Sequence, residues 1–175
     1  MALLNPLGGE SRVFKANSVG RIAIIERSKV SFTGTMNADN SITDITAITL
    51  ANIADKFQEV FYVEDSATFT QTSVKDTSKH FIDQVLEFKV DVISPKLFNE
   101  LQNGRYIALV QFPDENWYLV GTHKLGLSSK GDNTYNAAAD DSTPKLSLKG
   151  ICLGVAPNIT MTEDAVEALI NAATV

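Results

Sequence analysis

Residues 80–93 read His-Phe-Ile-Asp-Gln-Val-Leu-Glu-Phe-Lys-Val-Asp-Val-Ile, and this stretch decides the fold class. From Leu86 onward, apolar residues alternate with the charged residues Glu87, Lys89 and Asp91. Because successive side chains of a strand point to opposite faces, the alternation predicts one strand with an apolar and a charged face. Such a strand is typical of an antiparallel sheet with one side in water. Its apolar face is expected to consist of Leu86, Phe88, Val90 and Val92.

A short helix is predicted directly after this strand. Ser94 is a suitable N-cap, and Pro95 fits the first helical position, where its missing N–H is not needed. Gly104 predicts the end of the helix. The expected buried stripe of the helix consists of Leu97, Phe98 and Leu101.

Further strands are predicted on the C-terminal side. Residues 105–112 and 117–121 are two apolar runs separated by the turn Pro113-Asp-Glu-Asn. Residues 128–144 are rich in Ser, Gly, Asp, Asn and Ala, and this composition predicts a mobile loop. Alternation resumes at Lys145 and continues through Ile151, Leu153 and Val155.

The N-terminal half also has strand character. Residues 21–33 predict one strand or two short ones, with Ile22, Ile24, Val30 and Phe32 on a shared face. Residues 41–49 repeat Ser-Ile-Thr, Asp-Ile-Thr, Ala-Ile-Thr, a period that fits neither a strand nor a helix. Since Ile and Thr favour strands, we expect a strand followed by a helical turn near 50–56, and a helix near 44–57 stays open. Residues 57–74 predict two strands around a turn at 64–66.

The two ends of the chain differ from the middle. Residues 1–20 form a Gly-, Asn- and Ser-rich arm whose apolar residues predict docking, either on its own domain or on a neighbour. These candidate inter-subunit anchors are Leu3, Leu4, Leu7, Val13 and Phe14. Residues 160–175 predict a C-terminal helix, with Thr160 and Glu163 at the spacing of a capping box. Its apolar stripe is Val166, Leu169 and Ile170.

The fold class that follows is mainly β: an antiparallel β-barrel or sandwich with one short internal helix and a C-terminal helix. The sequence lacks the regular alternation of strand and helix that would indicate a parallel sheet. The domain itself is expected over residues 21–159, with the arm before it and the helix after it.

Length and composition fit one globular domain. The chain has 175 residues, a mass of 19.0 kDa, a net charge of −6 and a pI near 4.9. The acidic balance argues against a protein that grips a phosphate backbone. The sequence has one cysteine, so no internal disulfide forms, and we expect no signal peptide, no transmembrane helix and assembly in a reducing cytoplasm.

No constellation for chemistry is expected, and we predict neither an enzyme nor a bound cofactor. The two histidines, His80 and His123, lack a nucleophile motif, and Cys152 lies in an apolar run typical of a buried thiol. Zinc has no obvious ligands. Asp132-Asn133 and Asp140-Asp141 offer oxygen atoms for calcium, but without the spacing of an EF-hand, so a solvated loop is favoured.

The middle of the chain carries a resemblance. Lys79-His-Phe-Ile-Asp-Gln-Val-Leu-Glu-Phe-Lys-Val is followed by the short helix and by Gly104-Arg-Tyr-Ile-Ala-Leu-Val-Gln. Asn116-Trp-Tyr-Leu-Val-Gly-Thr and Lys145-Leu-Ser-Leu-Lys-Gly come next. This order over residues 79–155 resembles tail-tube and tail-ring proteins of phages that infect Bacteroidetes, including crAss-like phages.

The resemblance implies a structural protein of the virion, located in the tail or neck and assembled in the host cytoplasm. Such subunits form homo-oligomeric rings, commonly six-fold or a multiple, that stack or join other tail, neck or portal proteins. The ring or tube is a conduit for the genome, with transient, non-adhesive passage of DNA and no membrane partner. An acidic lining suits this role because it repels phosphate. The candidate lumen-facing acids are Asp83, Glu87 and Asp91.

The alternative is a monomeric β-sandwich that binds a small molecule or a carbohydrate. It requires Trp117 or Tyr118 at an exposed site beside Asp114, Glu115 or Asn116. Both aromatic residues lie inside a predicted strand, where packing in the core is favoured over stacking on a ligand.

Overall fold

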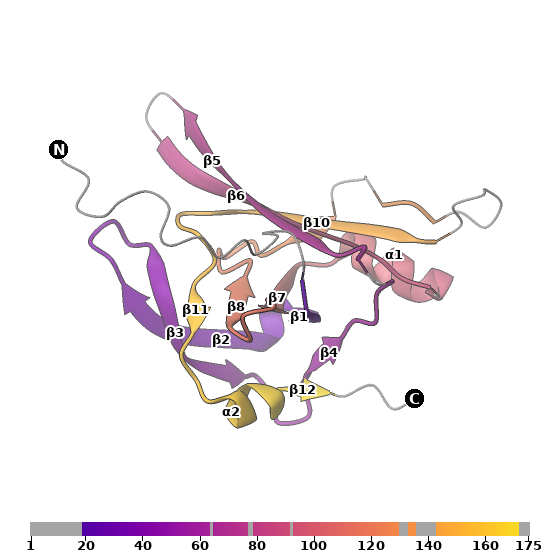
Figure 1. Ribbon diagram of the computed structural model, residues 1–175, viewed down its shortest axis with the longest axis horizontal. Helices are drawn as coiled ribbons and strands as arrows, with labels where there is room; N and C mark the ends of the chain where they lie inside the picture. The colour runs from indigo at the N-terminus through magenta and orange to yellow at the C-terminus, as the bar shows by residue number, and fades with distance from the viewer. Residues whose placement is uncertain are drawn as a thin grey trace.

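Two β-sheets and two α-helices make up the computed structural model, which describes residues 19–63, 65–76, 79–91, 93–129, 133–135 and 143–171 (Figure 1). The larger sheet has eight strands in the order β12-β4-β1-β7-β8-β11-β3-β2 and curls into a half-barrel. The smaller sheet has the order β5-β6-β10-β9 and lies across it. The mainly β class with few helices is therefore confirmed.

The strands of the large sheet are β1 (Arg21–Glu26), β2 (Val30–Met36), β3 (Ile42–Leu50), β4 (Phe57–Glu59), β7 (Tyr106–Gln111), β8 (Trp117–Val120), β11 (Asn158–Ile159) and β12 (Ile170–Asn171). Those of the small sheet are β5 (Thr68–Asp76), β6 (Lys79–Lys89), β9 (Ser128–Ser129) and β10 (Lys145–Cys152). The helices are α1 (Pro95–Asn103) and α2 (Glu163–Glu167). Neighbouring strands are antiparallel except in the pairs β11–β3 and β12–β4.

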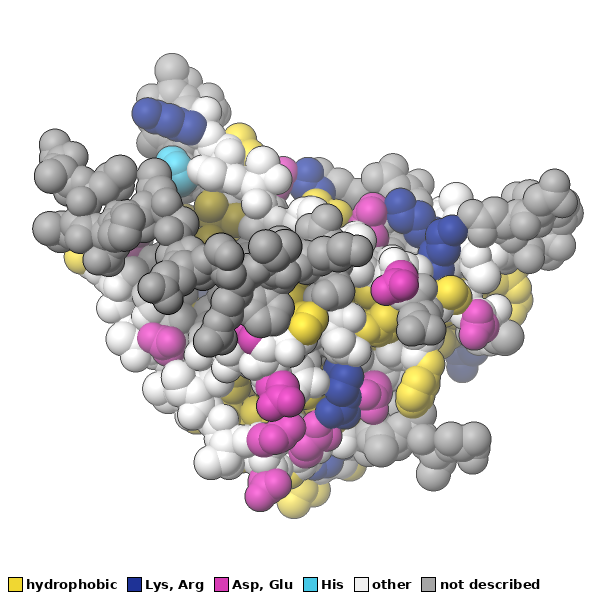
Figure 2. Space-filling model, in the orientation of Figure 1, with side chains coloured by type: hydrophobic (Ala, Val, Ile, Leu, Met, Phe, Trp, Pro, Cys, Tyr) yellow, Lys and Arg dark blue, Asp and Glu magenta, His cyan; other side chains and the backbone are white. Residues whose placement is uncertain are grey.

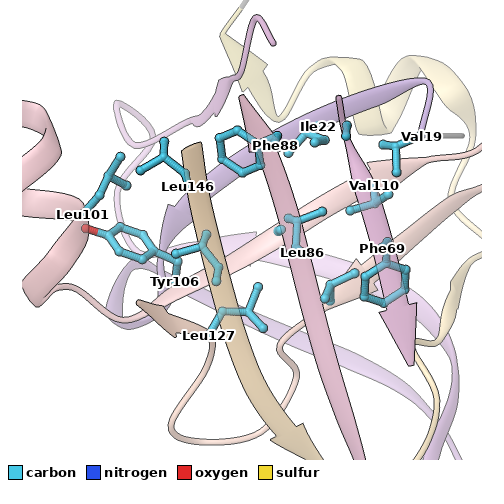
Figure 3. Packing of buried hydrophobic residues seen from close by; sticks show 14 of the residues in the cluster. Val19, Ile22, Phe69, Leu86, Phe88, Leu101, Tyr106, Val110, Leu127 and Leu146 are labelled. Carbon is cyan, nitrogen blue, oxygen red and sulfur yellow. The ribbon is translucent and has the colours of Figure 1, made fainter. Parts of the chain in front are cut away.

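The central strands β1, β7 and β8 supply two hydrophobic cores, one on each face. Ile22, Ala108 and Val120 pack in the core beneath the small sheet, while the adjacent Ala23 and Leu109 pack in the core inside the curl. Figure 3 shows the first of these cores. Because both faces of these strands are covered, they read as continuous apolar runs rather than as alternating ones.

Strand β6 follows the predicted alternation. Leu86, Phe88 and Val90 are buried in the first core, as expected, and Val92 lies outside the described residues. The prediction for residues 21–33 is correct in yielding two strands, which a short 3-10 turn separates. The shared face predicted there is wrong, since Ile22 and Val30 belong to different cores.

Helix α1 begins and ends where the sequence predicts. The Ser94 hydroxyl accepts a hydrogen bond from the Leu97 backbone N–H at 3.2 Å. Gly104 ends the helix with an extended backbone, and its position has no room for a side chain because the Tyr106 ring lies against it. Leu101 is buried as expected, but Leu97 is exposed, so the predicted buried stripe is wrong at that residue.

Residues 41–50 settle the ambiguity of the Ile-Thr repeat. The segment is strand β3, and the helix left open near 44–57 does not form. Ile45 and Ile48 are buried although they are three residues apart, because the register with β2 shifts between Thr33 and Gly34, which pair with Ala47 and Ile45 and leave Thr46 as an extra residue. A bulge of this kind moves a side chain to the other face without ending the strand. The second strand predicted in 57–74 is confirmed as β5, whereas the first is only the three residues of β4.

The C-terminal segment is only partly helical. Helix α2 covers five residues, its N-cap is Thr162, and β12 follows it on the edge of β4. The capping box predicted at Thr160 is wrong, since its hydroxyl donates to the Ile45 carbonyl at 3.1 Å instead. Strand β10 ends at Cys152, and Ile151, Leu153 and Val155 are exposed rather than continuing a buried face. The arm residues 1–18 and most of the 128–144 loop lie outside the described residues.

Candidate assembly surfaces

The β5–β6 hairpin projects from one side of the molecule (Figure 1). Strand β5 is nine residues long and is the terminal strand of the small sheet, so within the described residues its outer edge has no paired strand. Residues 68–74 carry no charge, and Thr70, Gln71, Thr72 and Ser73 are exposed. A long, uncharged edge strand presents a row of backbone donors and acceptors to another chain.

The candidate lumen acids lie on the outer face of β6, but they do not make this face acidic. The carboxylate of Asp83 pairs with the Lys149 ammonium at 2.8 Å, and that of Glu87 pairs with the Lys145 ammonium at 3.3 Å. By the strand register Lys89 lies on the same face, opposite Lys145. Asp91 is exposed beyond the end of the strand.

A buried polar network ties the base of the hairpin to its neighbours. Gln84 is fully buried, and its side-chain oxygen accepts hydrogen bonds from the Gly121 N–H at 3.0 Å and the Cys152 thiol at 3.2 Å. Its amide donates to Gln71 at 3.3 Å, and the Gln71 oxygen accepts from the Ala156 N–H at 2.6 Å. The alternation in 80–93 did not indicate a buried polar residue at position 84. Cys152 is a buried free thiol, as its apolar surroundings predicted.

The hairpin also brings Ser73 and His80 together. The Ser73 hydroxyl lies 3.1 Å from His80 Nε2, and both residues are exposed. Ser73 faces Ile82 and His80 faces Lys75 in the register, so this is a diagonal contact between two antiparallel strands. His123 lies elsewhere, where its Nδ1 accepts from the Leu125 N–H at 3.3 Å.

The aromatic residues of β8 pack against other side chains of the protein and are not exposed for stacking on a ligand. Trp117 is 4% exposed, and the Arg21 guanidinium covers its ring at 5.3 Å from the centroid. Tyr118 packs edge-on against Phe112 with the ring centroids 5.1 Å apart. The adjacent Asp114 side chain is engaged in its own turn by Asn116. The exposed aromatic required by the carbohydrate-binding alternative is therefore not present at this turn.

Arg21 joins three parts of the large sheet. Its guanidinium donates to Glu59 of β4 at 2.7 Å and, through two nitrogens, to Glu167 of α2. The hydrogen bonds to Glu167, and next those to Glu59, raise the pKa of Arg21 above its usual value. These contacts fix α2, and hence β12, against the edge of the sheet.

A groove opens between α1 and the segment that follows β4. Its volume is about 1230 Å³, and its walls include Phe61 and Leu97, two large apolar side chains that are 63% and 48% exposed. Hydrophobic side chains are visible on this face of the molecule in Figure 2. Leu97 was predicted to lie in the core, and for this reason the groove was not predicted from the sequence.

Comparison with known proteins identifies no family for this chain. Neither the protein-family models nor the curated proteins gave a match to this sequence. Within the described residues, no cluster of His, Cys, Asp and Glu is suited to a metal ion. Asn133 is the described member of the proposed calcium loop, and its side chain binds Ser129 and the Ser147 N–H. Neither α-helix of the described chain has the length and apolarity needed to cross a membrane.

Proposed function

We propose that the protein is a structural subunit that assembles with copies of itself into a ring or tube. The observation that carries the proposal is the outer edge of β5, which is long, carries no charge over residues 68–74 and is unpaired within the described residues. Monomeric proteins usually protect such edges with charges, prolines, bulges or a covering segment. When such an edge pairs with a different edge of a neighbouring copy, the contact is head-to-tail, and it closes into a ring if the rotation between subunits allows it.

The resemblance of residues 79–155 to tail-tube and tail-ring proteins supports the same class. On that basis we propose a place in the tail or neck of a phage, in contact with other virion proteins, as a conduit for the genome. The outer face of the small sheet is a poor lining for such a conduit because the carboxylates of Asp83 and Glu87 are each paired with a lysine. We therefore assign the channel to another surface of this acidic chain.

The test is the mass of the purified protein over a range of concentrations, with negative-stain images of the same samples. We expect oligomers that grow with concentration and appear as rings or tubes. Thr72→Lys places a charge on the exposed edge strand and is expected to shift the protein toward the 19.0 kDa monomer.

Thr49→Lys is the matched control, because Thr49 is an exposed threonine on the interior strand β3. It should leave assembly unchanged. A wild-type protein that stays a monomer at every concentration contradicts the proposal. If the two variants assemble equally, the edge of β5 is not the contact on which assembly depends.

A further inference from the structure

The groove between α1 and β4 has the character of a docking site for a peptide segment. Phe61 and Leu97 stand on its walls, and the apolar residues Ile24, Val60, Ile93 and Leu101 also line it. Exposed apolar side chains that gather in one concave place mark interaction sites. The volume of about 1230 Å³ exceeds the roughly 300–1,000 Å³ of pockets for small ligands.

The charges at the rim are balanced. Lys29 pairs with Asp55 at 3.6 Å, and Lys96 pairs with Glu100 at 3.9 Å. A rim of this kind offers no strong electrostatic preference, so the occupant is selected by apolar surface. An apolar segment with few charges fits it better than a nucleic acid or a strongly charged peptide.

The chain itself contains such a segment before Val19, where the described structure begins. These 18 residues include six large apolar ones and only three charged ones, Glu10, Arg12 and Lys15. The large apolar residues are Met1 and the five anchors Leu3, Leu4, Leu7, Val13 and Phe14.

The described chain begins beside this groove. Tyr62, which follows the wall residue Phe61, donates to the Val19 carbonyl at 2.6 Å. The Gly20 N–H donates to the Gln111 carbonyl at 2.7 Å and continues the ladder between β1 and β7. Both edges of β1 are occupied, by β4 and β7, so β1 offers no free edge to a further strand.

We propose that the N-terminal arm of one copy docks in the groove between α1 and β4 of a second copy. This inference rests on the proposed assembly and adds a second contact between its subunits, beside the edge of β5. Fully extended, 18 residues reach about 60 Å. A globular domain of this length is about 40 Å across, so the arm is long enough to cross to a neighbour.

Cross-linking between two populations of the full-length protein tests the contact. One population carries Leu4→Cys and the other carries Leu97→Cys, and the two are mixed and treated with a short bismaleimide. We expect a linked pair in the mixture, at several times the yield obtained when Leu125→Cys replaces Leu97→Cys. Leu125 is an exposed leucine outside the groove, and the native Cys152 is buried.

A matched pair of charge substitutions supplies a second readout. Burial of a leucine side chain stabilises a contact by about 1.5–3 kcal/mol, so Leu97→Asp is expected to weaken self-association at least tenfold. Leu125→Asp should leave it unchanged. The far-UV circular dichroism of both variants checks that the fold is retained.

The outcomes separate this inference from the proposed function. Assembly without a Leu4–Leu97 link between chains overturns the docking inference and leaves the proposed assembly intact. A chain carrying both cysteines that links only within itself places the arm in its own groove and also overturns the inference. A monomer at every concentration, with no link between chains, overturns both.

Discussion

Gln84 shows how a single buried polar residue connects surfaces that are distant in the sequence. Its side-chain oxygen accepts from a backbone N–H of the segment after β8 and from a thiol of β10, and its amide nitrogen donates to a side chain of β5. The Gly121 N–H would otherwise be left without a hydrogen bond in a region closed to water, where an unsatisfied polar group is costly. The residue therefore fixes the small sheet on the large one.

Gln84→Met keeps a similar side-chain length and removes these hydrogen bonds. Because the Gly121 N–H then loses its acceptor, we expect the free energy of unfolding to fall by about 1–3 kcal/mol in urea denaturation. Gln58→Met, on the exposed side of β4, is the control and should change it by less than about 0.5 kcal/mol. Equal effects of the two substitutions contradict the proposed role of the network.

The roles of some single residues were predictable from the sequence, and those of others were not. The Ser94 cap follows from local chemistry and is confirmed, since its hydrogen bond joins residues three positions apart. Gly104 was predicted to end the helix and does so, with an extended backbone and the Tyr106 ring where a side chain would lie. Gln84 was missed because its three partners come from segments that only the fold brings together.

Short elements depend on contacts rather than on their own propensity. Helix α2 has five residues and β12 has two, which is too short for either to persist alone. Their position is set by the burial of Val166 and Ile170 and by the bonds from Arg21 to Glu167. The sequence predicted one longer helix over 160–175 because the apolar spacing at 166, 169 and 170 fits a helix as well.

Arg21→Met is expected to loosen this end of the sheet. It removes the bonds to Glu59 and Glu167 and leaves Glu59 partly buried, so the free energy of unfolding should fall by about 1–3 kcal/mol. Hydrogen exchange of the α2 and β12 amides should rise more than exchange in β7.

Lys96→Met breaks the exposed pair with Glu100 and is the matched control, with an expected change of about 0–0.5 kcal/mol. Unchanged exchange in α2 and β12 of Arg21→Met contradicts the idea that the arginine holds them.

On the scale of the whole molecule, strands β1, β7 and β8 form a layer shared by two cores. Neither core is complete without this layer, so we expect the described domain to unfold in one cooperative transition. The mainly β class was predictable because alternation and turn residues are local signals. The division into two sheets was not, since it depends on which face each apolar residue of a continuous run occupies.

The same packing makes the fold sensitive to alkaline pH. Burial raises the pKa of Tyr62, Tyr106 and Tyr118 above the usual value near 10. The folded state keeps these phenols protonated where the unfolded chain ionises them, so their stabilising contribution is complete below about pH 10 and is lost as the pH rises further.

Urea denaturation between pH 9 and pH 11 should therefore show a falling free energy of unfolding. Tyr106→Phe is expected to reduce the slope, since one phenol no longer ionises on unfolding. A slope that is the same with and without this substitution contradicts the assignment.

The position of Arg21 against Glu167 has a consequence for how the protein is made. These two side chains meet although they are 146 residues apart in the chain. Strand β1 lies inside the large sheet, yet the strand that covers the β4 edge is synthesised after every other strand of the described chain. Pairings between such distant segments form slowly because the loop between them must be closed first. During translation the nascent chain thus carries an open β4 edge until β12 emerges, and in that interval the edge is exposed to pairing with other chains.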